Sequence, residues 1–482
     1  MMKIPFQGRV LLLGCGAVSQ CFQPLLLRHF EMDFTRLTVM DFEDRRANIT
    51  DTLAAGAHYV QQRITPENLS MVLGQYLGPG DLLIDLAWNI GAADIVQWSH
   101  DHEVLYINTS VELWDPYFGE WDPPPERTLY ARHMALRRLA STWTEPGATA
   151  VVEHGANPGL VSHWTKVGLR DVASTMLQKG LGEDRRPGLE KALADGDYAQ
   201  LAMLTGTKVI HISERDTQIG DNPKRVNEFV NTWSVAGFYE EGIATAEMGW
   251  GTHERRLPEY AQQHTYGPCN QICLSQMGIN TYVRSWVPMG EIIGMVVRHG
   301  EAFTISDHLT VWQDGVPVYR PTVHYAYLPT DAAMASLHEM KMRNYQMQGC
   351  ERIMTEEIIS GKDELGVLLL GHDLNGWWTG SQLDIHEARR LVPHHNATTL
   401  QVAASVTGAL TWMIRNPRRG LLVPDDLPFD EVLAVANPYL GPCPSIQTDW
   451  TPLKNRVELF GKYGRPGPAP EDVWQFDTFK AW

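Results

Sequence analysis

Short apolar runs alternate with helix-permitting stretches through the first third of the chain. Runs that are apolar on both faces and separated by helices are typical of a parallel sheet covered on both sides. The pattern therefore predicts an α/β domain with a Rossmann-type, doubly wound parallel sheet. Its expected strands lie at residues 9–14, 36–41, 58–62, 81–87, 103–110 and 149–155.

The pattern changes after Asn157. A helix is expected over 157–173, because Pro158 stands where a first helical turn tolerates proline. A polar connection at 180–197 follows it. Strand-like runs then succeed one another with turn residues between them, which indicates a separate α+β domain with a mostly antiparallel or mixed sheet. These runs lie at 208–218, 228–238, 280–288, 294–312 and 316–327.

A further long helix is expected near residue 400. Asn396 or Thr398 can cap its start, and Pro417 ends it. A chain of 482 residues is too long for one ordinary core. We expect three parts: a Rossmann domain over 1–157, an α+β domain over 158–395, and a C-terminal segment, about 396–482, that packs back on the first domain.

Composition narrows the class of protein. With 44% hydrophobic and 20% charged residues the chain is globular, and it holds no apolar run of about 18 residues that would span a membrane. The start, MMKIPFQGRV, lacks the features of a signal peptide, so a cytoplasmic location is expected. A net charge of −17 disfavours nucleic acid and favours cationic partners, although many enzymes are acidic for solubility alone.

The six cysteines are scattered, which favours free thiols over a disulfide framework. Cys269 and Cys273 are close to each other, but no second Cys or His pair stands at the spacing of a zinc ribbon. No metal site is expected.

The link between the first strand and the first helix carries a dinucleotide motif, Gly14-Cys15-Gly16-Ala17-Val18-Ser19. The glycines allow a tight turn and let backbone N–H groups approach a pyrophosphate. Ser19 stands where the usual motif has a third glycine. Asp41 ends the second strand, where a carboxylate accepts the ribose hydroxyls and repels a 2′-phosphate. NAD is the expected cofactor, and the nearby Arg45 and Arg46 keep NADP open.

Polar loops follow the later strands, at the sheet edge where open α/β sheets bind ligands. They contain Asn89 after the fourth strand, Asn108 and Thr109 after the fifth, and Ala156 and Asn157 after the sixth. We expect Asn108, Thr109 and Ala156 to contact the cofactor and Asn89 and Asn157 to contact the substrate. Alternatively, each asparagine caps the helix that follows it.

The stretch NTWSVAGFYEEG, residues 231–242, combines an indole with two adjacent carboxylates. A ring face attracts cations and a carboxylate pairs with an ammonium, so Trp233 and Glu241 favour a cationic ligand. In the alternative interpretation Trp233 and Phe238 belong to the core and the glutamates are solvated.

Segments spread over nearly the whole chain resemble those of bacterial homospermidine synthases, members of the saccharopine dehydrogenase-like superfamily. They are GANPGLVS (155–162), HISERDTQ (211–218), NTWSVAGF (231–238), AEMGWGT (246–252), RPTVHYAY (320–327), DELGVLL (363–369), GSQL (380–383), NATTLQV (396–402) and TDWTPL (448–453).

The resemblance implies a homodimer and a redox-neutral reaction on polyamines. One putrescine is oxidised with bound NAD, ammonia leaves, the aminobutyl imine or aldehyde condenses with a second putrescine, and the hydride returns to give homospermidine. Spermidine is a further possible substrate. The domain at 158–395 would then bind substrate and form the dimer. The implied catalytic residues are Trp233, Glu241, Glu214 and His299, and the implied substrate-binding residues are Asn157, Asp363 and Asn89.

Other interpretations of these residues stay open. Glu214 can pair with Arg215, His299 can be a core histidine, and Asp363 can cap a turn. Relatives carry an acid in the loop that holds Asn89 here, which leaves open what pairs with the outer ammonium. A carboxynorspermidine or saccharopine dehydrogenase is the alternative enzyme, and would need a cationic side chain for its substrate carboxylate. A protein that binds NAD without turnover is the alternative from another class.

Overall fold

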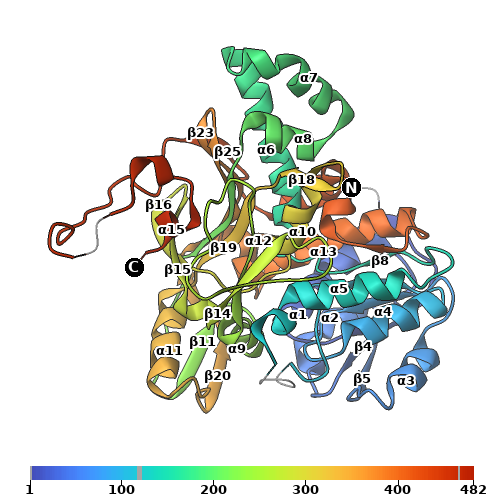
Figure 1. Cartoon of the computed structure of the whole chain (residues 1–482). Coiled ribbons are helices and arrows are strands. Elements are labelled where there is room, and N and C mark those ends of the chain that lie inside the picture. The colour runs from blue at the N-terminus through green and yellow to red at the C-terminus, as the bar shows by residue number, and fades with distance from the viewer. Residues whose placement is uncertain (1–2, 117–121, 465–466, 482) are drawn as a thin grey trace.

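Seven parallel strands form the first sheet of the computed structural model, which describes residues 3–116, 122–464 and 467–481 (Figure 1). The six strands expected from the N-terminal third are all present, so the Rossmann-type fold class is confirmed. A seventh strand comes from far along the chain and pairs with the last of these six. In spatial order they are β24 (Leu421–Leu422), β8 (Ala150–Val151), β7 (Leu105–Asn108), β6 (Leu82–Asp85), β2 (Val10–Leu13), β4 (Leu37–Asp41) and β5 (His58–Gln61).

Helices cover both faces of this sheet because its strands are apolar on both sides. Val10 and Leu12 pack with α1 (Ala17–His29) and α13 (Ala397–Arg415). Leu11 and Leu13 face the opposite core, which contains residues of α3 (Leu69–Tyr76), α4 (Ala92–Asp101) and α5 (Leu129–Ala140). The alternation of side chains along β2 thus assigns successive residues to two cores.

The helix expected near residue 400 is α13, and it lies against α1 of the Rossmann sheet. The Asn396 side chain accepts a hydrogen bond from the Thr399 backbone N–H at 2.8 Å, so Asn396 is the N-cap. After α14 (Phe429–Ala436), the chain leaves this sheet and joins the second one through β25 (Ser445–Thr448).

The second sheet has ten strands and mixed pairing, as the pattern predicted. Its central pair is parallel, β19 with β9, and β22 then pairs antiparallel with β9. The strands are β9 (Val209–Asp216), β12 (Thr245–Gly249), β13 (Ala261–Gln263), β14 (Gln271–Met277), β15 (Tyr282–Val287), β16 (Gly290–Met295), β19 (Thr322–Leu328), β22 (Lys362–His372), β23 (Asn375–Asp384) and β25.

Three segments differ from the sequence prediction because they are helical. Residues 228–238 contain the short strand β11 (Glu228–Asn231), and then α9 (Val235–Ile243) begins, capped by the Ser234 side chain. The run 294–312 contains α10 (Glu301–His308), which is buried along most of its length. The polar connection 180–197 contains α7 (Arg186–Asp195).

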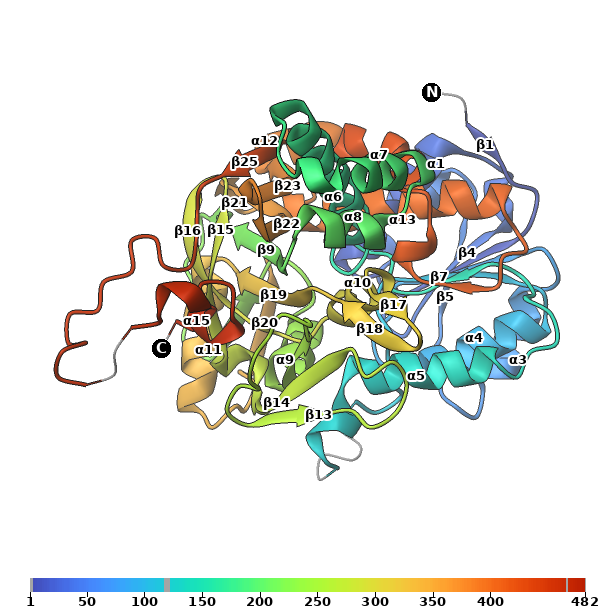
Figure 2. The same ribbon diagram turned by 45° about the horizontal axis from the view of Figure 1, so that its top comes forward.

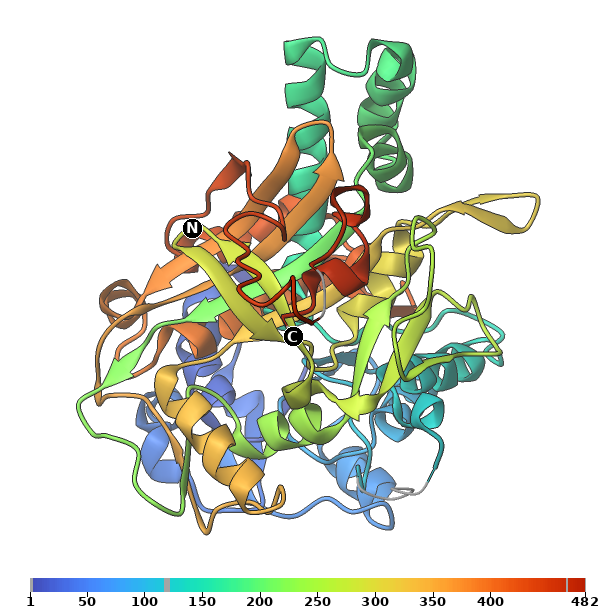
Figure 3. The ribbon, with the colours of Figure 1, turned by 60° about the vertical axis from the view of Figure 1, so that its left-hand side comes forward.

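Two parts project from the body. α7 and α8 (Tyr198–Thr205) pack as a hairpin at the end of the long helix α6 (Leu160–Lys179), which stands out from the sheets in Figure 3. Near the C-terminus an irregular arm extends away from the second sheet before α15 (Phe476–Phe479) returns to it (Figure 2). Among the described residues, no helix is long and apolar enough to cross a bilayer.

Candidate active site

The turn between β2 and α1 has the geometry that a dinucleotide needs. Gly14 has a φ of +83°, and a side chain there would meet the Leu86 carbonyl oxygen at 2.6 Å. Gly16 is the N-cap of α1, and its Cβ direction is open. Ala17 and Val18 begin the helix half-buried. The helix N-terminus therefore has free space above it for an anion.

Asp41, at the end of β4, is joined to this turn. Its Oδ2 accepts a hydrogen bond from the Cys15 backbone N–H at 2.6 Å, and its Oδ1 accepts from the Glu43 N–H at 2.9 Å. The two neighbouring arginines are engaged locally, Arg45 with Glu43 and Arg46 with Asp44. The carboxylate is thus fixed beside the glycine turn.

Asn108 is bound into a buried network at the ends of the Rossmann strands. Its Nδ2 donates to the Tyr106 hydroxyl at 2.8 Å, and its Oδ1 accepts from the Glu153 backbone N–H at 2.8 Å. Tyr106 in turn donates to Asp85 at 3.0 Å, and burial raises the pKa of Asp85 to about 7. Both ends of the Asn108 amide are therefore occupied within the protein. Thr109 lies half-buried beside the loop that begins at Gly155, and Ala156 is buried in that loop.

Three carboxylates lie on one face of the second sheet. Glu214 and Asp216 are two residues apart on β9, and Asp363 of β22 stands opposite Asp216 in the antiparallel register. All three are buried. Burial raises the pKa of Glu214 to about 7 and that of Asp216 to about 6, and burial together with the two neighbouring acids raises the pKa of Asp363 well above its ordinary value.

These acids differ in the number of hydrogen bonds that the protein donates to them. Asp216 accepts hydrogen bonds from Gln218 and, at 2.8 Å, from the Thr232 hydroxyl. Asp363 accepts from Thr398 at 2.7 Å through one oxygen. Its other oxygen, Oδ1, receives no hydrogen bond from an N–H or hydroxyl group, and its carboxyl group interacts with that of Glu214. A buried carboxylate oxygen without a donor is suited to an ammonium ligand.

The loop after β8 reaches from the Rossmann sheet to this acid group. Asn157 Nδ2 donates to Glu214 Oε2 at 2.9 Å and to the Tyr325 hydroxyl at 2.6 Å. Tyr325 itself donates to Glu214 Oε2. Trp233 lies at the other end of the group, where its Nε1–H donates to the Tyr327 hydroxyl at 3.0 Å.

His299 lies between two glutamates. Its Nε2 is 3.2 Å from Glu241 Oε2 and its Nδ1 is 3.1 Å from Glu301 Oε1. Burial lowers the pKa of His299, but the charges of Glu301 and Glu241 outweigh it and raise that pKa well above its ordinary value, which favours the protonated ring. The ring also packs against Tyr325, with centroids 4.4 Å apart.

A second charged group lies between α5 and α9. Glu240 accepts from Arg132 at 2.7 Å and also from Arg298. Glu112 is partly buried nearby, with one buried oxygen, Oε2, that has no partner, and desolvation together with the Glu240 charge raises its pKa to about 7. Arg215 lies 3.7 Å from Asp331 and, being adjacent to Glu214 on β9, points to the other face of the sheet.

The structure brings Glu214, Asp363, Asn157, Trp233, His299 and Glu241 into one connected group. Asn89 lies apart from it in the loop after β6, with a φ of +64° and a buried side-chain oxygen that has no partner. Among the residues of these groups that sequence reasoning missed are Asp216, Tyr325, Tyr327, Glu301 and Glu112.

A signal for some of these residues was present in the sequence. Asp216 follows Glu214, and Tyr327 follows Tyr325, at the two-residue spacing that places side chains on one strand face. The register between β9 and β19, which sequence does not give, decides that these faces coincide.

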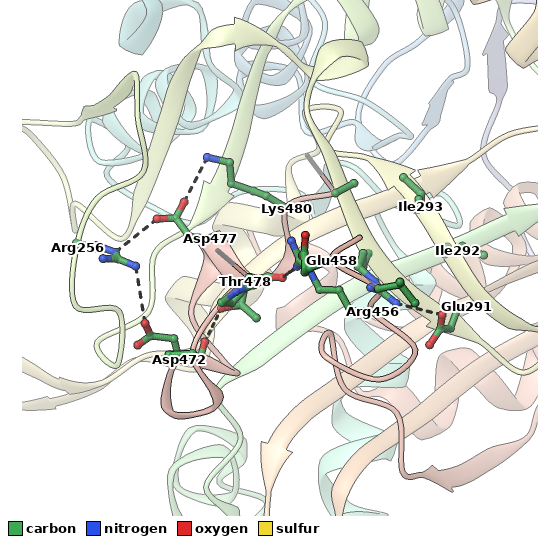
Figure 4. A pocket seen from close by; sticks show the side chains of 16 residues that line it. Arg256, Glu291, Ile292, Ile293, Arg456, Glu458, Asp472, Asp477, Thr478 and Lys480 are labelled. Carbon is green, nitrogen blue, oxygen red and sulfur yellow. Dashed lines mark hydrogen bonds and ion pairs between the residues drawn. The ribbon is translucent and has the colours of Figure 1, made fainter. Parts of the chain in front are cut away.

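One surface cavity of the described residues lies elsewhere. It has a volume of about 900 Å³ and is lined by the C-terminal arm and by β16, and none of the residues of the acid group lines it (Figure 4). Its arginines and lysine form ion pairs with acids of the same wall, for example Arg284 with Glu291 at 3.2 Å. The acid group, which joins the two sheets, is therefore the candidate site.

A glycine turn on a Rossmann sheet, joined through Asn157 to buried acids and an indole, defines a dinucleotide-dependent enzyme of the dehydrogenase type. Residues 10–151 match the model of the saccharopine dehydrogenase NADP binding domain, and residues 155–444 match that of the saccharopine dehydrogenase C-terminal domain. The chain belongs to the saccharopine dehydrogenase family and, within it, to the homospermidine synthases.

Two relatives and one solved structure support that membership. The homospermidine synthase of Blastochloris viridis is 41% identical, over 97% of this chain and 96% of that protein. The homospermidine synthase of Mesorhizobium japonicum is 40% identical, over 97% of this chain and 95% of that protein. The crystal structure of the Legionella pneumophila homospermidine synthase, in complex with NAD, is 36% identical with a TM-score of 0.87, and covers 100% of this chain and 99% of that chain.

Proposed function

We propose that this enzyme condenses two molecules of putrescine into homospermidine and ammonia, with NAD as a cofactor that is regenerated within the cycle. The observation that carries the proposal is the hydrogen bond from Asn157 to Glu214. It holds a buried acidic and aromatic group at the edge of the Rossmann sheet where a nicotinamide would lie. Membership in the homospermidine synthases supports it.

The turn at Gly14 and Gly16 fits NAD. Open space beside Gly16 suits the pyrophosphate, and Asp41 would accept the ribose hydroxyls and repel a 2′-phosphate. The family model is described as NADP-binding, whereas the Legionella relative was solved with NAD. Asp41 favours NAD, and the ion pairs that Arg45 and Arg46 make with acids weaken the case for a phosphate site. When bound there, NAD would supply the hydride acceptor for amine oxidation and the hydride donor for imine reduction.

Glu214 and Asp363 hold one ammonium of the diamine in this proposal. Their raised pKa values mean that they retain protons while the site holds no cation, because burial disfavours several charges together. A dication supplies the missing positive charge, so binding releases protons from the acids. When putrescine binds, its ammonium group therefore replaces the protons on Glu214 and Asp363.

Trp233 stabilises the cationic imine that forms when the amine-bearing carbon loses its hydride. A ring face contributes about 0.5–2 kcal/mol to a nearby cation without binding it covalently. His299, as an imidazolium between Glu241 and Glu301, supplies a proton to the departing ammonia and recovers it from the second amine. The atoms balance, since two putrescines lose one ammonia to give one homospermidine.

The alternative enzymes act on substrates with a carboxylate and would need a free cation. Arg298, the buried candidate, is paired with Glu240, and Arg215 faces away from the acid group. These contacts favour a diamine over a carboxylated amine.

Deuterated putrescine tests the proposal. Putrescine with deuterium on both amine-bearing carbons is incubated with the enzyme and substoichiometric NAD, and products are analysed by mass spectrometry. Return of the same hydride gives homospermidine that keeps every deuterium. Product that lacks one deuterium would contradict the internal cycle, and absence of homospermidine would exclude the function. An NAD-binding protein without turnover would give neither product.

Several expectations stay predictions. They are the domain limits at 157 and 395, the homodimer formed through 158–395, the cytoplasmic location, the use of spermidine, and contacts of Thr109, Ala156 and Asn89 with ligands.

A further inference from the structure

Two tyrosines of β19 occupy the centre of the acid group. Tyr325 and Tyr327 are two residues apart, so their side chains point to the same face, and their rings stack with centroids 5.1 Å apart and planes 11° apart. In the parallel pairing of β19 with β9, Tyr327 is the partner of Glu214. Both rings are buried, with exposed fractions of 3% and 1%.

Tyr325 joins three residues of the proposed site. Its hydroxyl donates to Glu214 Oε2 and accepts from Asn157 Nδ2 at 2.6 Å, and its ring packs against His299. Glu214 Oε2 thus receives two hydrogen bonds, one from the loop after β8 and one from β19. Such donors fix the direction of a carboxylate and favour its charged form.

Tyr327 fixes the indole. The Trp233 Nε1–H donates in the ring plane to the Tyr327 hydroxyl at 3.0 Å, while Phe238 packs 5.6 Å from the indole centroid. A donor bond at Nε1 sets the rotation of the indole about its long axis and leaves the ring face to a ligand. It also increases electron density in the ring, which strengthens attraction for a cation.

We propose that Tyr325 and Tyr327 act as a stacked pair of positioning residues that orient the Glu214 carboxylate and the Trp233 ring face toward one diamine. The proposal rests on the proposed function for the identity of the diamine. Neither tyrosine is assigned a proton-transfer step, because burial raises the pKa of both phenols well above the ordinary value and keeps both neutral. Because the two tyrosine rings stack, the orientation of the Glu214 carboxylate is coupled to that of the Trp233 ring. The pairing of Glu214 with an ammonium and the contact of a cation with the indole therefore depend on each other.

Tyr325→Phe is tested through the pH dependence of putrescine capture. Loss of the phenol donor leaves the buried Glu214 harder to ionise, because the hydrogen bond from Tyr325 lowers the pKa that burial raises. The acidic limb of kcat/KM for putrescine is expected to move up by about one pH unit. In the Glu214→Gln background the same substitution should produce no further displacement of that limb.

Tyr319→Phe is the matched control. Tyr319 is a partly buried tyrosine whose hydroxyl donates a hydrogen bond to the Thr207 carbonyl at 2.7 Å, and it lies outside the acid group. Its loss should lower the melting temperature while leaving the acidic limb unchanged. An equal displacement of the limb in both variants, or none in Tyr325→Phe, would overturn the role of Tyr325.

Tyr327→Phe is tested by a measurement that needs no turnover. The enzyme is labelled with 5-fluorotryptophan, and the ¹⁹F resonance of Trp233 is assigned by its loss in Trp233→Phe. Tyr327→Phe should shift and broaden that resonance in the ligand-free enzyme, and Tyr319→Phe should not. An unmoved Trp233 resonance would overturn the role of Tyr327.

Calorimetry separates failure of this proposal from failure of the proposed function. If the wild-type enzyme makes no homospermidine, the ¹⁹F arm and the pH dependence of putrescine binding by calorimetry still decide the positioning roles. If homospermidine forms but Tyr325→Phe and Tyr327→Phe behave as Tyr319→Phe does, the function stands and the positioning proposal is overturned.

Discussion

Asn157 donates a hydrogen bond to Glu214 across the junction of the two sheets, with 2.9 Å between Nδ2 and Oε2. Asn157 follows β8 of the Rossmann sheet, and Glu214 lies within β9 of the second sheet. The bond therefore sets the distance between the cofactor edge and the acid group. The Asn157 amide is a neutral donor. It therefore holds the Glu214 carboxylate without supplying a positive charge that would replace an ammonium ligand.

We expect Asn157→Asp to lower kcat/KM for putrescine by a hundredfold or more at neutral pH. A second carboxyl beside the buried Glu214 raises the pKa of the pair, since like charges cannot both ionise there at low cost. Steady-state kinetics between pH 6 and 9 would measure the loss, which should diminish at high pH. Asn157→Ser, which keeps a small donor, is the control and should lose less. Equal activity of Asn157→Asp and wild type at pH 7 would contradict the proposed contact.

Trp233→Leu is expected to lose at least tenfold in turnover while NAD is retained. Leucine keeps apolar bulk and removes the ring face, which is worth about 0.5–2 kcal/mol to a cation and more when water is excluded. Trp233→Phe should retain an intermediate rate because it keeps a weaker ring. Homospermidine formation is measured by chromatography and cofactor content by absorbance.

The control for the indole is Trp312→Leu. Trp312 is an exposed tryptophan of β17 (Val311–Gln313), outside the acid group. Its replacement should leave turnover within twofold of wild type. If Trp233→Leu and Trp312→Leu have equal rates, the cationic imine does not depend on the ring.

The pH dependence of stability follows from the raised pKa of Glu214. The folded protein keeps this proton to about pH 7, whereas the unfolded chain releases it near the ordinary value of 4.5. Between these values the folded state binds more protons, so this group's contribution to the free energy of unfolding falls as pH rises. Buried neutral histidines such as His324, whose pKa burial lowers to about 4, act in the opposite direction.

A comparison of wild type with Glu214→Gln isolates that contribution. We expect the melting temperature of Glu214→Gln, relative to that of wild type, to increase as pH rises from 5 to 8. Putrescine should raise the wild-type melting temperature more at pH 8 than at pH 5, because the acid must ionise to pair with ammonium. Calorimetric melting curves measure both effects. A putrescine effect that is largest at pH 5 would argue against recognition by ionised acids.

The Rossmann sheet could be predicted because its strands are buried on both faces. Residues such as Leu11 and Leu12 face different cores, so the whole run is apolar and stands out from the helices. α9 and α10 were predicted as strands because their buried residues include Val, Ile and Phe, which are common in sheets. The Ser234 cap was the local signal that a helix begins.

The site could be predicted only in part, because pairing between distant strands decides it. Asp216 follows Glu214 at strand spacing, but its burial opposite Asp363 depends on the register of β9 with β22. The sequence likewise shows that Tyr325 and Tyr327 share a face without showing which face. The cofactor contact of Asn108 stays a prediction, and the two hydrogen bonds that its amide makes within the protein could not be read from the sequence.

Asp41→Asn should weaken NAD binding by about tenfold and narrow the preference for NAD over NADP. The carboxylate makes charge-assisted hydrogen bonds, which contribute about 1.5–3 kcal/mol each, and an amide accepts with one oxygen only. That oxygen can accept from the Cys15 N–H or from the Glu43 N–H but does not replace both carboxylate oxygens, so the glycine turn also loses a hydrogen bond.

Equilibrium binding of NAD and NADP to the cofactor-free enzyme measures the effect of Asp41→Asn. Asp51→Asn, which alters an exposed acid at the start of α2 (Thr50–Ala54), is the control and should bind both as wild type does. If Asp41→Asn kept the wild-type ratio of NAD to NADP affinity, the ribose would be recognised elsewhere.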